Sequence, residues 1–300
     1  MEPSADRPGF DAVTRLTILH ETRYSYEHPV GFGAHRLLLR PRDSHAIRVV
    51  EASLSTSCPG EMRWVFDPLG NCVCLFTPQG EADHLHITNR LVIDRYPAPL
   101  AYLRADNPHT AMPIAYPVED RVVLSPFITP VLEDRDGSVF RWVAGHLRSH
   151  GEPALDFLLR LNRTIHDQFT YHARHEEGVQ TPAETLRLGS GTCRDFAWLM
   201  VESLRWLGYA TLFVSGYVNS GAMRGAGATH AWCEVFLPGL GWMEFDPTNG
   251  VAESVDLIRI AASRRPQEAA PVSGVILGDP GATRLDVHVD VGPLVLSAAA

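Results

Sequence analysis

The sequence predicts an α+β protein in which an all-β, sandwich-like domain precedes a mixed region where a helix packs on an antiparallel sheet. Residues 13–95 consist of short, often alternating apolar segments separated by Gly, Pro, Asn and Asp, a pattern typical of strands and turns. From residue 138 the apolar residues recur at helical spacing, and strand-like segments return after residue 209. A chain of 300 residues is long enough for two folding units.

The first region, placed at 11–97, is predicted to form a small β-domain. The turn between two of its strands is predicted at Asp67-Pro68-Leu69-Gly70-Asn71, because these residue types favour tight turns. The predicted strands span 14–20, 36–41, 49–54, 62–66, 71–77 and 84–93.

A proline-rich connector is predicted at 98–137. Prolines stand at positions 97, 99, 108, 113, 117, 126 and 130, and the stretch shows little periodicity. We therefore expect a connector that packs on the surface and is too apolar in places to be a free linker.

The core of the second region is placed at 138–262. Helices are predicted at 138–149, 153–169, 182–188 and 193–207, the third because Thr181 and Glu184 have the spacing of a capping box. Strands are predicted at 210–218, 230–237 and 241–246, with the last two joined as an antiparallel hairpin by the turn 238–241. Further strands at 272–277 and 285–291 are predicted to rejoin a sheet, so that 263–300 forms a C-terminal β tail packed back on the protein.

Composition excludes several classes of function. The formal net charge is −9, all 26 basic residues are Arg, and no basic cluster is present, so nucleic acid is not an expected partner. No apolar run reaches the roughly 18 residues of a membrane span, and the first ten residues lack the apolar segment of a signal peptide. We expect a soluble, cytoplasmic protein. Its five cysteines, at 58, 72, 74, 193 and 233, are expected to be free thiols.

One of these thiols stands where a helix is predicted to begin. Thr192 and Asp195 fit an N-cap and third-position pair, which places Cys193 at the first helical position. The unpaired amide groups and the positive end of the helix dipole stabilise a thiolate there, and a thiolate is the reactive form of cysteine. The same amides favour an oxyanion, and Gly189 and Gly191 allow a substrate to come close.

A thiol nucleophile needs a base, and the base needs a group that orients it. Strand alternation puts His230, Trp232 and Glu234 on one face, with Ala231 and Cys233 on the other. The returning strand carries Asp246 on the face of His230. The residues therefore predict a Cys193, His230 and Asp246 triad, and they predict Cys233 as a core residue.

Three segments carry a resemblance to a known family. They read GSGTCRDFAWLMVESLRWLG, SGYV and GAGATHAWCEVFLPGLGWMEFDPTNG, and together they resemble the bacterial transglutaminase-like superfamily. The segments YSYEHPV and HRLLLRPR are similar to the β-domain that precedes this core in many bacterial members. The resemblance implies a papain-like core with Cys193 as nucleophile, His230 as general base and Asp246 as orienting acid. It implies no metal and no organic cofactor.

The chain departs from the family at two places, neither in the triad. Many members have His where Trp198 stands, and many carry Gly-Arg-Asp-Tyr where this chain has Ser-Arg-Arg-Pro at 263–266. The substrate details are thereby left open. Gln168 and Tyr171 are candidates for a second oxyanion donor. The three tryptophans at 198, 232 and 242 are typical of a core, and Trp232 is the best placed of them to line the site. The Gly-rich segment 219–229 is predicted to be a plain long loop, with a flap over the site as the alternative.

The favoured hypothesis is acyl transfer on an amide bond of a protein or peptide, through a thioester at Cys193. Water is slightly favoured over an amine as the acceptor, which makes hydrolysis the expected reaction. The alternative is a catalytically silent binding module that uses the N-terminal β-domain. A third hypothesis is a metal or redox protein built on Cys72 and Cys74 with His84 and His86, whose spacing lacks the usual CxxC pattern. Oligomeric state is not predicted.

Overall fold

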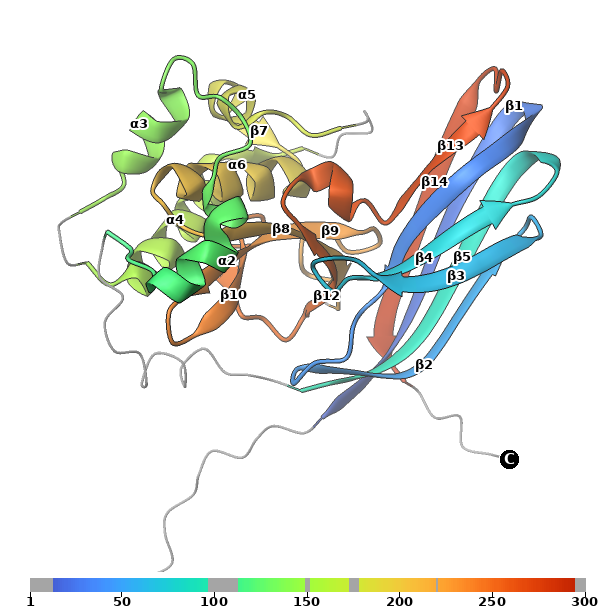
Figure 1. The fold of residues 1–300 in the computed structure, drawn as a ribbon, viewed down its shortest axis with the longest axis horizontal. Helices are drawn as coiled ribbons and strands as arrows, with labels where there is room; N and C mark the ends of the chain where they lie inside the picture. The colour runs from blue at the N-terminus through green and yellow to red at the C-terminus, as the bar shows by residue number, and fades with distance from the viewer. Residues whose placement is uncertain (1–12, 97–112, 149–151, 173–177, 220, 295–300) are drawn as a thin grey trace, which may run out of the picture.

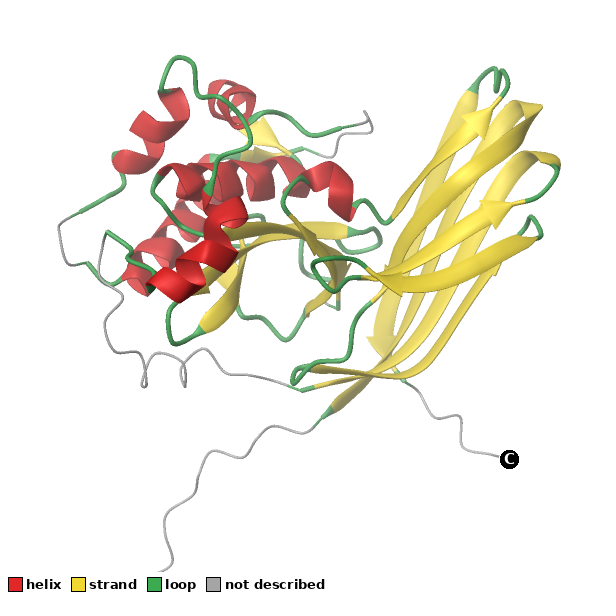
Figure 2. Ribbon diagram, in the orientation of Figure 1, coloured by secondary structure: helices red, strands yellow, loops and turns green. Residues whose placement is uncertain are grey.

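The computed structural model describes residues 13–96, 113–148, 152–172, 178–219 and 221–294. One half of the molecule consists of strands alone, and the other places helices around a five-stranded sheet (Figures 1 and 2). The predicted order, a β-domain followed by a mixed core, is confirmed. The helices of the described residues include none with the length and apolarity that crossing a bilayer requires.

The β-domain is a sandwich formed around one long strand, β1 (Thr14–Arg40). The first half of β1 pairs with β5 and β14, and its second half pairs with β4 and β13. Side chains from both halves, such as Leu37, Phe76 and Ile87, form one buried cluster between them. The other strands are β2 (Ile47–Thr56), β3 (Gly60–Phe66), β4 (Cys72–Pro78), β5 (Glu81–Arg95), β13 (Val272–Leu277) and β14 (Thr283–Pro293).

Two predicted strands, 14–20 and 36–41, are wrong as separate elements, because β1 runs through both without a break. The sequence between them contains Pro29, which lacks the N–H group that a strand needs. Pro29 falls where the register of β1 against β5 shifts, between Ser25 and Val30, so no regular ladder bond is lost there.

The sheet of the core has the order β11-β10-β9-β8-β12. Its strands are β8 (Thr211–Val218), β9 (His230–Leu237), β10 (Gly241–Asp246), β11 (Val251–Ala252) and β12 (Leu257–Ser263). The predicted β9–β10 hairpin is confirmed as an antiparallel pair. Sequence reasoning missed β12, because most of its side chains are buried and its apolar residues do not alternate with polar ones. The short helix η1 (Pro266–Ala269) follows it.

The helices are α2 (Val118–Ile128), α3 (Ser138–Ala144), α4 (Ala154–Gln168), α5 (Pro182–Leu188) and α6 (Cys193–Trp206). The last three are confirmed to within one residue at each end, whereas α3 ends early, at Ala144, with Gly145 as its C-cap. The predicted connector 98–137 contains the helix α2, which sequence reasoning missed, and its part at 98–112 lies outside the described residues. The sequence did not reveal α2, because its apolar residues do not gather on one face of the helix. Three of them, Val118, Val122 and Val123, are exposed in the structure.

Helix α6 is buried along nearly its whole length and packs on the face of β9 that carries Ala231, Cys233 and Val235. This confirms the predicted alternation of β9 and the assignment of Cys233 to the core. The opposite face, with Trp232, packs against Leu212 and Val214 of β8.

Buried hydrogen bonds join the two halves of the molecule. The Tyr217 hydroxyl on β8 donates to the carbonyl of Leu39 at 3.1 Å and lies 2.9 Å from Nδ1 of His20. The side chain of Asn71 donates to the carbonyl of Ala262 and accepts from its N–H, at 2.7 and 2.9 Å. Because both partners of each bond are buried, the β-domain and the core are fixed to one another.

A cluster of carboxyl groups lies on β9, β10 and the turn that follows β11. Burial, followed by the charges of Glu234 and Glu253, raises the pKa of Glu244 to about 8. The folded protein therefore holds a proton that the unfolded chain, with the ordinary glutamate pKa of 4.5, releases between these pH values. Since the folded state binds more protons between these two values, stability is expected to fall as pH rises from about 4.5 through 8.

We expect Glu244→Gln to remove part of this pH dependence of stability, because a neutral amide has no proton to release as the pH rises. The melting temperature of the variant should exceed that of the wild type at pH 9 and approach it at pH 5, as measured by calorimetry at both values. Glu133→Gln, at a side chain 79% exposed, is the matched control and should follow the wild type. A Glu244→Gln profile parallel to that of the wild type would contradict the prediction.

Candidate active site

The first element of the site is the start of α6. The helix begins at Cys193 with Thr192 as N-cap, as predicted. The carboxylate of Asp195 accepts from the N–H and hydroxyl of Thr192, at 2.8 and 2.9 Å, and from the N–H of Gln180 at 2.7 Å. Asp195 is fully buried, so these bonds fix the chain just before Cys193. The N–H groups of Cys193 and Arg194 have no acceptor within the helix, as in any first helical turn.

Tyr171 lies beside this helix start. The short strands β6 (Thr170–Tyr171) and β7 (Ser190–Gly191) run parallel, and Tyr171 is paired with Gly191. Its ring meets that of Phe196 edge-on, with centroids 6.4 Å apart. Burial first, and then the charge of the Cys193 thiolate, raise the pKa of Tyr171. The hydroxyl is therefore protonated at neutral pH and can donate a hydrogen bond. Gln168, the other candidate donor, is exposed at the end of α4.

His230 and Asp246 form a buried pair at the opening of the β9–β10 hairpin. Nε2 of His230 lies 2.9 Å from Oδ2 of Asp246, and both side chains are 0% exposed. Oδ1 of Asp246 accepts from the N–H of Thr248 at 2.9 Å and from that of Asn249 at 3.3 Å. Burial raises the pKa of Asp246, but the charge and hydrogen bond of His230, the side chain of Asn249 and the N–H of Thr248 outweigh it, so the pKa is lowered. The group beside the imidazole is thus a carboxylate.

Cys193 completes the arrangement. Burial lowers the pKa of His230, but the charges of Asp246 and of the Cys193 thiolate, with a side-chain hydrogen bond from each, raise it well above its ordinary value. Because Nε2 is occupied by Asp246, the thiol can meet only Nδ1, which has no partner of ideal hydrogen-bond geometry. The structure therefore brings together all three residues that the sequence singled out, with the two ring nitrogens serving different partners.

Cys193 is more exposed to solvent than Cys233, the other thiol in the core of this half of the molecule. Cys193 keeps 7% of its surface exposed, whereas Cys233 is 0% exposed, and burial raises the pKa of Cys233 strongly. Burial also raises the pKa of Cys74, to about 11. Among the described residues, no group of three or more His, Cys, Asp or Glu is arranged to bind a metal ion, including the strands β4 and β5 that carry Cys72, Cys74, His84 and His86.

Three residues near the triad were missed by sequence reasoning. Asn249 donates through Nδ2 to Oδ2 of Asp246 at 2.7 Å, and Arg224 and Gly225 belong to the segment 219–229. Gly225 lies directly against His230, so this part of the predicted loop covers the imidazole. The sequence Asp-Pro-Thr-Asn at 246–249 is typical of a turn, and this feature could have indicated that Asn249 lies close to Asp246. Trp232 is 0% exposed and packs in the core, which confirms the favoured expectation for this residue and not the alternative that it lines the site.

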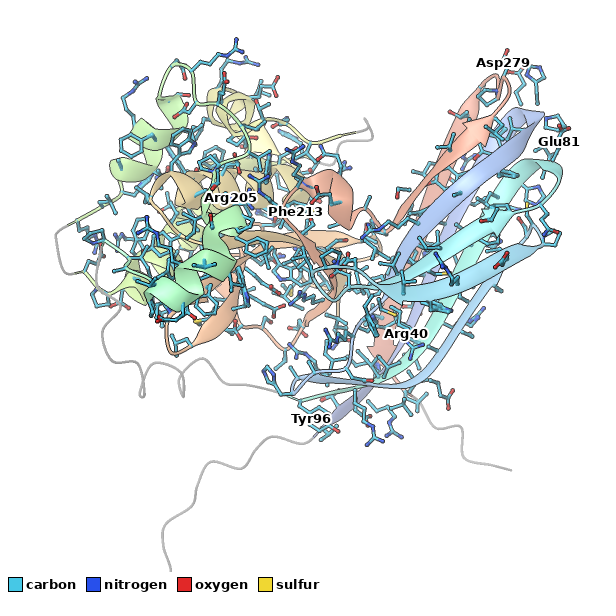
Figure 3. The ribbon with its side chains drawn as sticks, in the orientation of Figure 1. Arg40, Glu81, Tyr96, Arg205, Phe213 and Asp279 are labelled. Carbon is cyan, nitrogen blue, oxygen red and sulfur yellow. The ribbon has the colours of Figure 1, made fainter. Side chains whose placement is uncertain are left out.

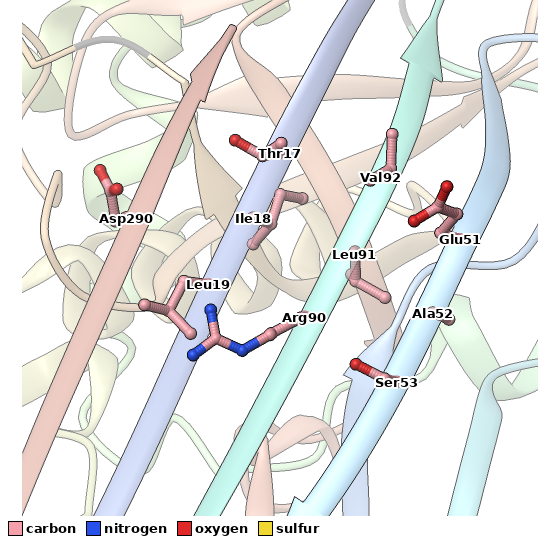
Figure 4. Close-up of a pocket in the computed structure, with 10 residues that line it drawn as sticks. All are labelled: Thr17, Ile18, Leu19, Glu51, Ala52, Ser53, Arg90, Leu91, Val92 and Asp290. Atoms are coloured by element: carbon pink, nitrogen blue, oxygen red, sulfur yellow. The ribbon is translucent and has the colours of Figure 1, made fainter. Parts of the chain in front are cut away.

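The structure also has a shallow depression on the β-domain, across β14, β1, β5 and β2 (Figure 4). Its lining includes Thr17, Glu51, Arg90 and Asp290. It shares no residue with the triad and contains no thiol or imidazole, so it has no part in the chemistry considered below.

Two family models match the chain in the places where the structure has its two halves. Residues 16–94 match the bacterial transglutaminase-like N-terminal region, and residues 142–247 match the transglutaminase-like superfamily. The chain belongs to the transglutaminase-like superfamily. The second match contains Cys193, His230 and Asp246, and membership of this superfamily supports a cysteine-dependent enzyme as the general class of function.

Relatives of this transglutaminase-like protein extend over most of its length. An uncharacterized protein of Mycobacterium tuberculosis is 28% identical over 93% of both chains, and one of Mycobacterium leprae is 26% identical over 92% of this chain and 98% of its own. A protein-glutamine gamma-glutamyltransferase of Pseudomonas aeruginosa is 33% identical over 125 residues, which is 37% of this chain and 18% of that protein.

A solved structure has the same fold as this transglutaminase-like protein. It is described as a "putative cysteine protease" from Cytophaga hutchinsonii and superimposes with a TM-score of 0.70, over 96% of this chain and 93% of that one. Sequence identity is 17%, so the likeness concerns the fold. It confirms that the β-domain and the papain-like core occur together in one arrangement.

Proposed function

We propose that this protein is a cysteine-dependent acyl-transfer enzyme that acts on amide bonds of proteins or peptides through Cys193, His230 and Asp246. One observation carries the proposal. The imidazole of His230 is held by Asp246 at Nε2, 2.9 Å away, while Nδ1 is left for the thiol at the N-terminus of α6. A binding module has no need of a buried imidazole with one nitrogen oriented by a carboxylate and the other facing a thiol.

The proposed reaction proceeds in two steps. The thiolate of Cys193 attacks the carbonyl carbon, and the electron pair of the C=O bond moves to the oxygen. The N–H groups at the start of α6 and the hydroxyl of Tyr171 stabilise that oxyanion. When the C=O bond re-forms, the C–N bond breaks, and the leaving nitrogen takes the proton from Nδ1 of His230. The products of this step are a free amine and a thioester on Cys193.

In the second step, Nδ1 of the now neutral His230 takes a proton from the acceptor, which attacks the thioester. Water as the acceptor gives a carboxylic acid, and a primary amine gives a new amide. Either way the thiolate leaves, and the thiolate–imidazolium pair is restored. We propose hydrolysis as the main reaction, because water is the more abundant acceptor. Release of acid and incorporation of a fluorescent primary amine, measured side by side on a glutamine-rich test protein, distinguish the two outcomes.

The experiment that tests the proposal is labelling with iodoacetamide across pH, located by mass spectrometry, on the wild type and on His230→Ala. We expect fast labelling of Cys193 that persists near pH 6, where an ordinary thiol with a pKa of about 8.5 reacts several hundred times more slowly than its thiolate. Loss of His230 should remove this reactivity. Cys233 of the same sample is the internal control and should not be labelled.

Slow labelling of Cys193 that falls tenfold with each pH unit below about 8.5, with no change in His230→Ala, would contradict the proposal. That result would favour the alternative of a catalytically silent module in which the N-terminal β-domain binds the partner.

A further inference from the structure

Asn249 makes contacts on both sides of the turn that follows β10. Its Nδ2 donates to Oδ2 of Asp246 at 2.7 Å, the same oxygen that faces Nε2 of His230. Its Oδ1 accepts from the backbone N–H of Arg224 at 2.8 Å, and its Nδ2 lies 3.2 Å from the carbonyl oxygen of Arg224. A single amide side chain therefore joins the carboxylate of the triad to the backbone of the segment 219–229.

The next residue of that segment, Gly225, lies against the imidazole. Its φ is +95°, in the region that favours glycine. A Cβ atom built on Gly225 would lie 2.3 Å from Nδ1 of His230, far inside van der Waals contact. The backbone at Gly225 thus covers the ring on the side of the nitrogen that Asp246 leaves free, and no larger residue fits there without moving the imidazole or the backbone.

Further contacts hold the same segment. The carbonyl oxygen of Gly227 accepts from the N–H of Val289 on β14 at 3.0 Å, which connects the segment to the β-domain. Met223 packs on the cluster that contains Trp232, whose ring centroid lies 6.1 Å from that of His230. The segment is therefore held by the β-domain and the core, and Asn249 makes the hydrogen bond that joins it to the carboxylate of the triad.

We propose that Asn249 is a positioning residue that sets the Asp246 carboxylate and the Arg224–Gly225 backbone in one arrangement around His230. The proposal rests on the proposed function, since it concerns the same thiol and imidazole. Nδ2 of Asn249 fixes the rotation of the carboxylate, and Oδ1 holds the glycine against the ring. Together they confine the imidazole to the orientation that presents Nδ1 to Cys193.

The test uses two variants of the full chain and two measurements. The first measurement is the rate of iodoacetamide labelling of Cys193 as a function of pH, and the second is the hydrogen-exchange rate of the Arg224 amide. In Asn249→Ala we expect labelling at pH 6–7 to fall about 10- to 100-fold, the range found when a partner that orients a metal-bound histidine is removed. We also expect the Arg224 amide to exchange faster, because its acceptor is gone.

Asn249→Asp separates the two contacts. Its carboxylate keeps an acceptor for the Arg224 N–H, so that amide should stay protected. It has no N–H to donate to Asp246 and adds a second negative charge beside it, so the labelling rate should fall as far as in Asn249→Ala. A residue that only stabilised the fold would change both measurements together. Asn219→Ala is the control, because it makes the same substitution on the same segment. Asn219 is bonded through its backbone N–H, which alanine keeps, so this variant should match the wild type.

The results distinguish this inference from the proposed function. If the wild type and His230→Ala label alike, the proposed function fails, and the positioning role fails with it. If His230→Ala lowers the rate but both Asn249 variants label like the wild type, the positioning role alone is overturned. If Asn249→Ala does not fold, Asn249→Asp decides, because a protected Arg224 amide shows that its segment is intact.

Discussion

Replacing Cys193 with alanine is expected to abolish acyl transfer, by about 10³-fold or more, because the residual catalysis would rest on the oxyanion donors alone. Stability should change little, since the side chain is small and lies at the edge of the core with 7% of its surface exposed. Turnover of an amide substrate and the thermal melting curve, measured on the same samples, check both parts of this expectation.

The same variant should change the titration of His230. The negative charge of the Cys193 thiolate is one of the causes that raise the pKa of His230, and alanine removes it. The pKa of His230 should therefore be lower in Cys193→Ala than in the wild type. Titration of the imidazole Cε1 proton by NMR measures this directly. Asp246 remains in the variant, so the pKa is not expected to fall to that of an isolated buried imidazole.

Cys58→Ala is a matched control, because Cys58 is also 7% exposed but lies in the β-domain, with its thiol donating to the carbonyl of His84. It should keep both the activity and the titration of His230. An active Cys193→Ala variant would exclude Cys193 as the nucleophile. An inactive variant with an unchanged His230 pKa would show that the thiol and imidazole are not coupled as an ion pair.

The positions of the triad were predictable from sequence because each depends on local structure. Cys193 is fixed by an N-cap, and His230 and Asp246 are fixed by strand alternation and a short hairpin. These effects act over a few residues, so they can be read along the chain. The catalytic roles of the three residues, and the cytoplasmic location, stay predictions.

The surroundings of the triad could not be predicted in the same way. Gly225 faces His230 and Asn249 reaches Arg224 only because segments separated by up to 25 residues meet in the folded chain. Likewise, β13 and β14 were predicted as strands, but their pairing with β1 depends on contacts across about 240 to 280 residues. Helix α2 was missed because its exposed valines gave no stripe, and its place is set by buried polar contacts.

Those polar contacts centre on one buried ion pair (Figure 3 shows Arg205 in the helical half). Arg205 of α6 donates to Glu202 at 2.7 Å, and the two side chains are 0% and 1% exposed. Arg205 also donates to the carbonyl oxygens of Phe127 and Thr211, at 3.0 and 2.9 Å. Glu202 accepts from the N–H groups of Val131 and Leu132, each at 2.9 Å. The pair thus ties α2 and the turn after it to α6 and β8.

Arg205→Met is expected to lower the free energy of unfolding by about 3–5 kcal/mol, because it leaves the Glu202 carboxylate buried without its counter-charge. Methionine retains much of the apolar volume, so the loss reflects the charge and the hydrogen bonds rather than a cavity. Urea unfolding followed by far-UV circular dichroism measures it. Arg135→Met, which breaks the exposed pair of Arg135 with Glu133, is the matched control and should leave the midpoint unchanged.

The double variant Arg205→Met with Glu202→Leu shows which part of the effect is electrostatic. It removes both charges, so it should lose less stability than the sum of the single variants if the unpaired charge dominates. Additive losses would instead assign the effect to the backbone groups, because Phe127 loses its donor only with Arg205, whereas Val131 and Leu132 lose their acceptor only with Glu202. Since these groups belong to α2 and the turn after it, additivity would mean that α2 is held by its hydrogen bonds and not by the charge pair beneath it.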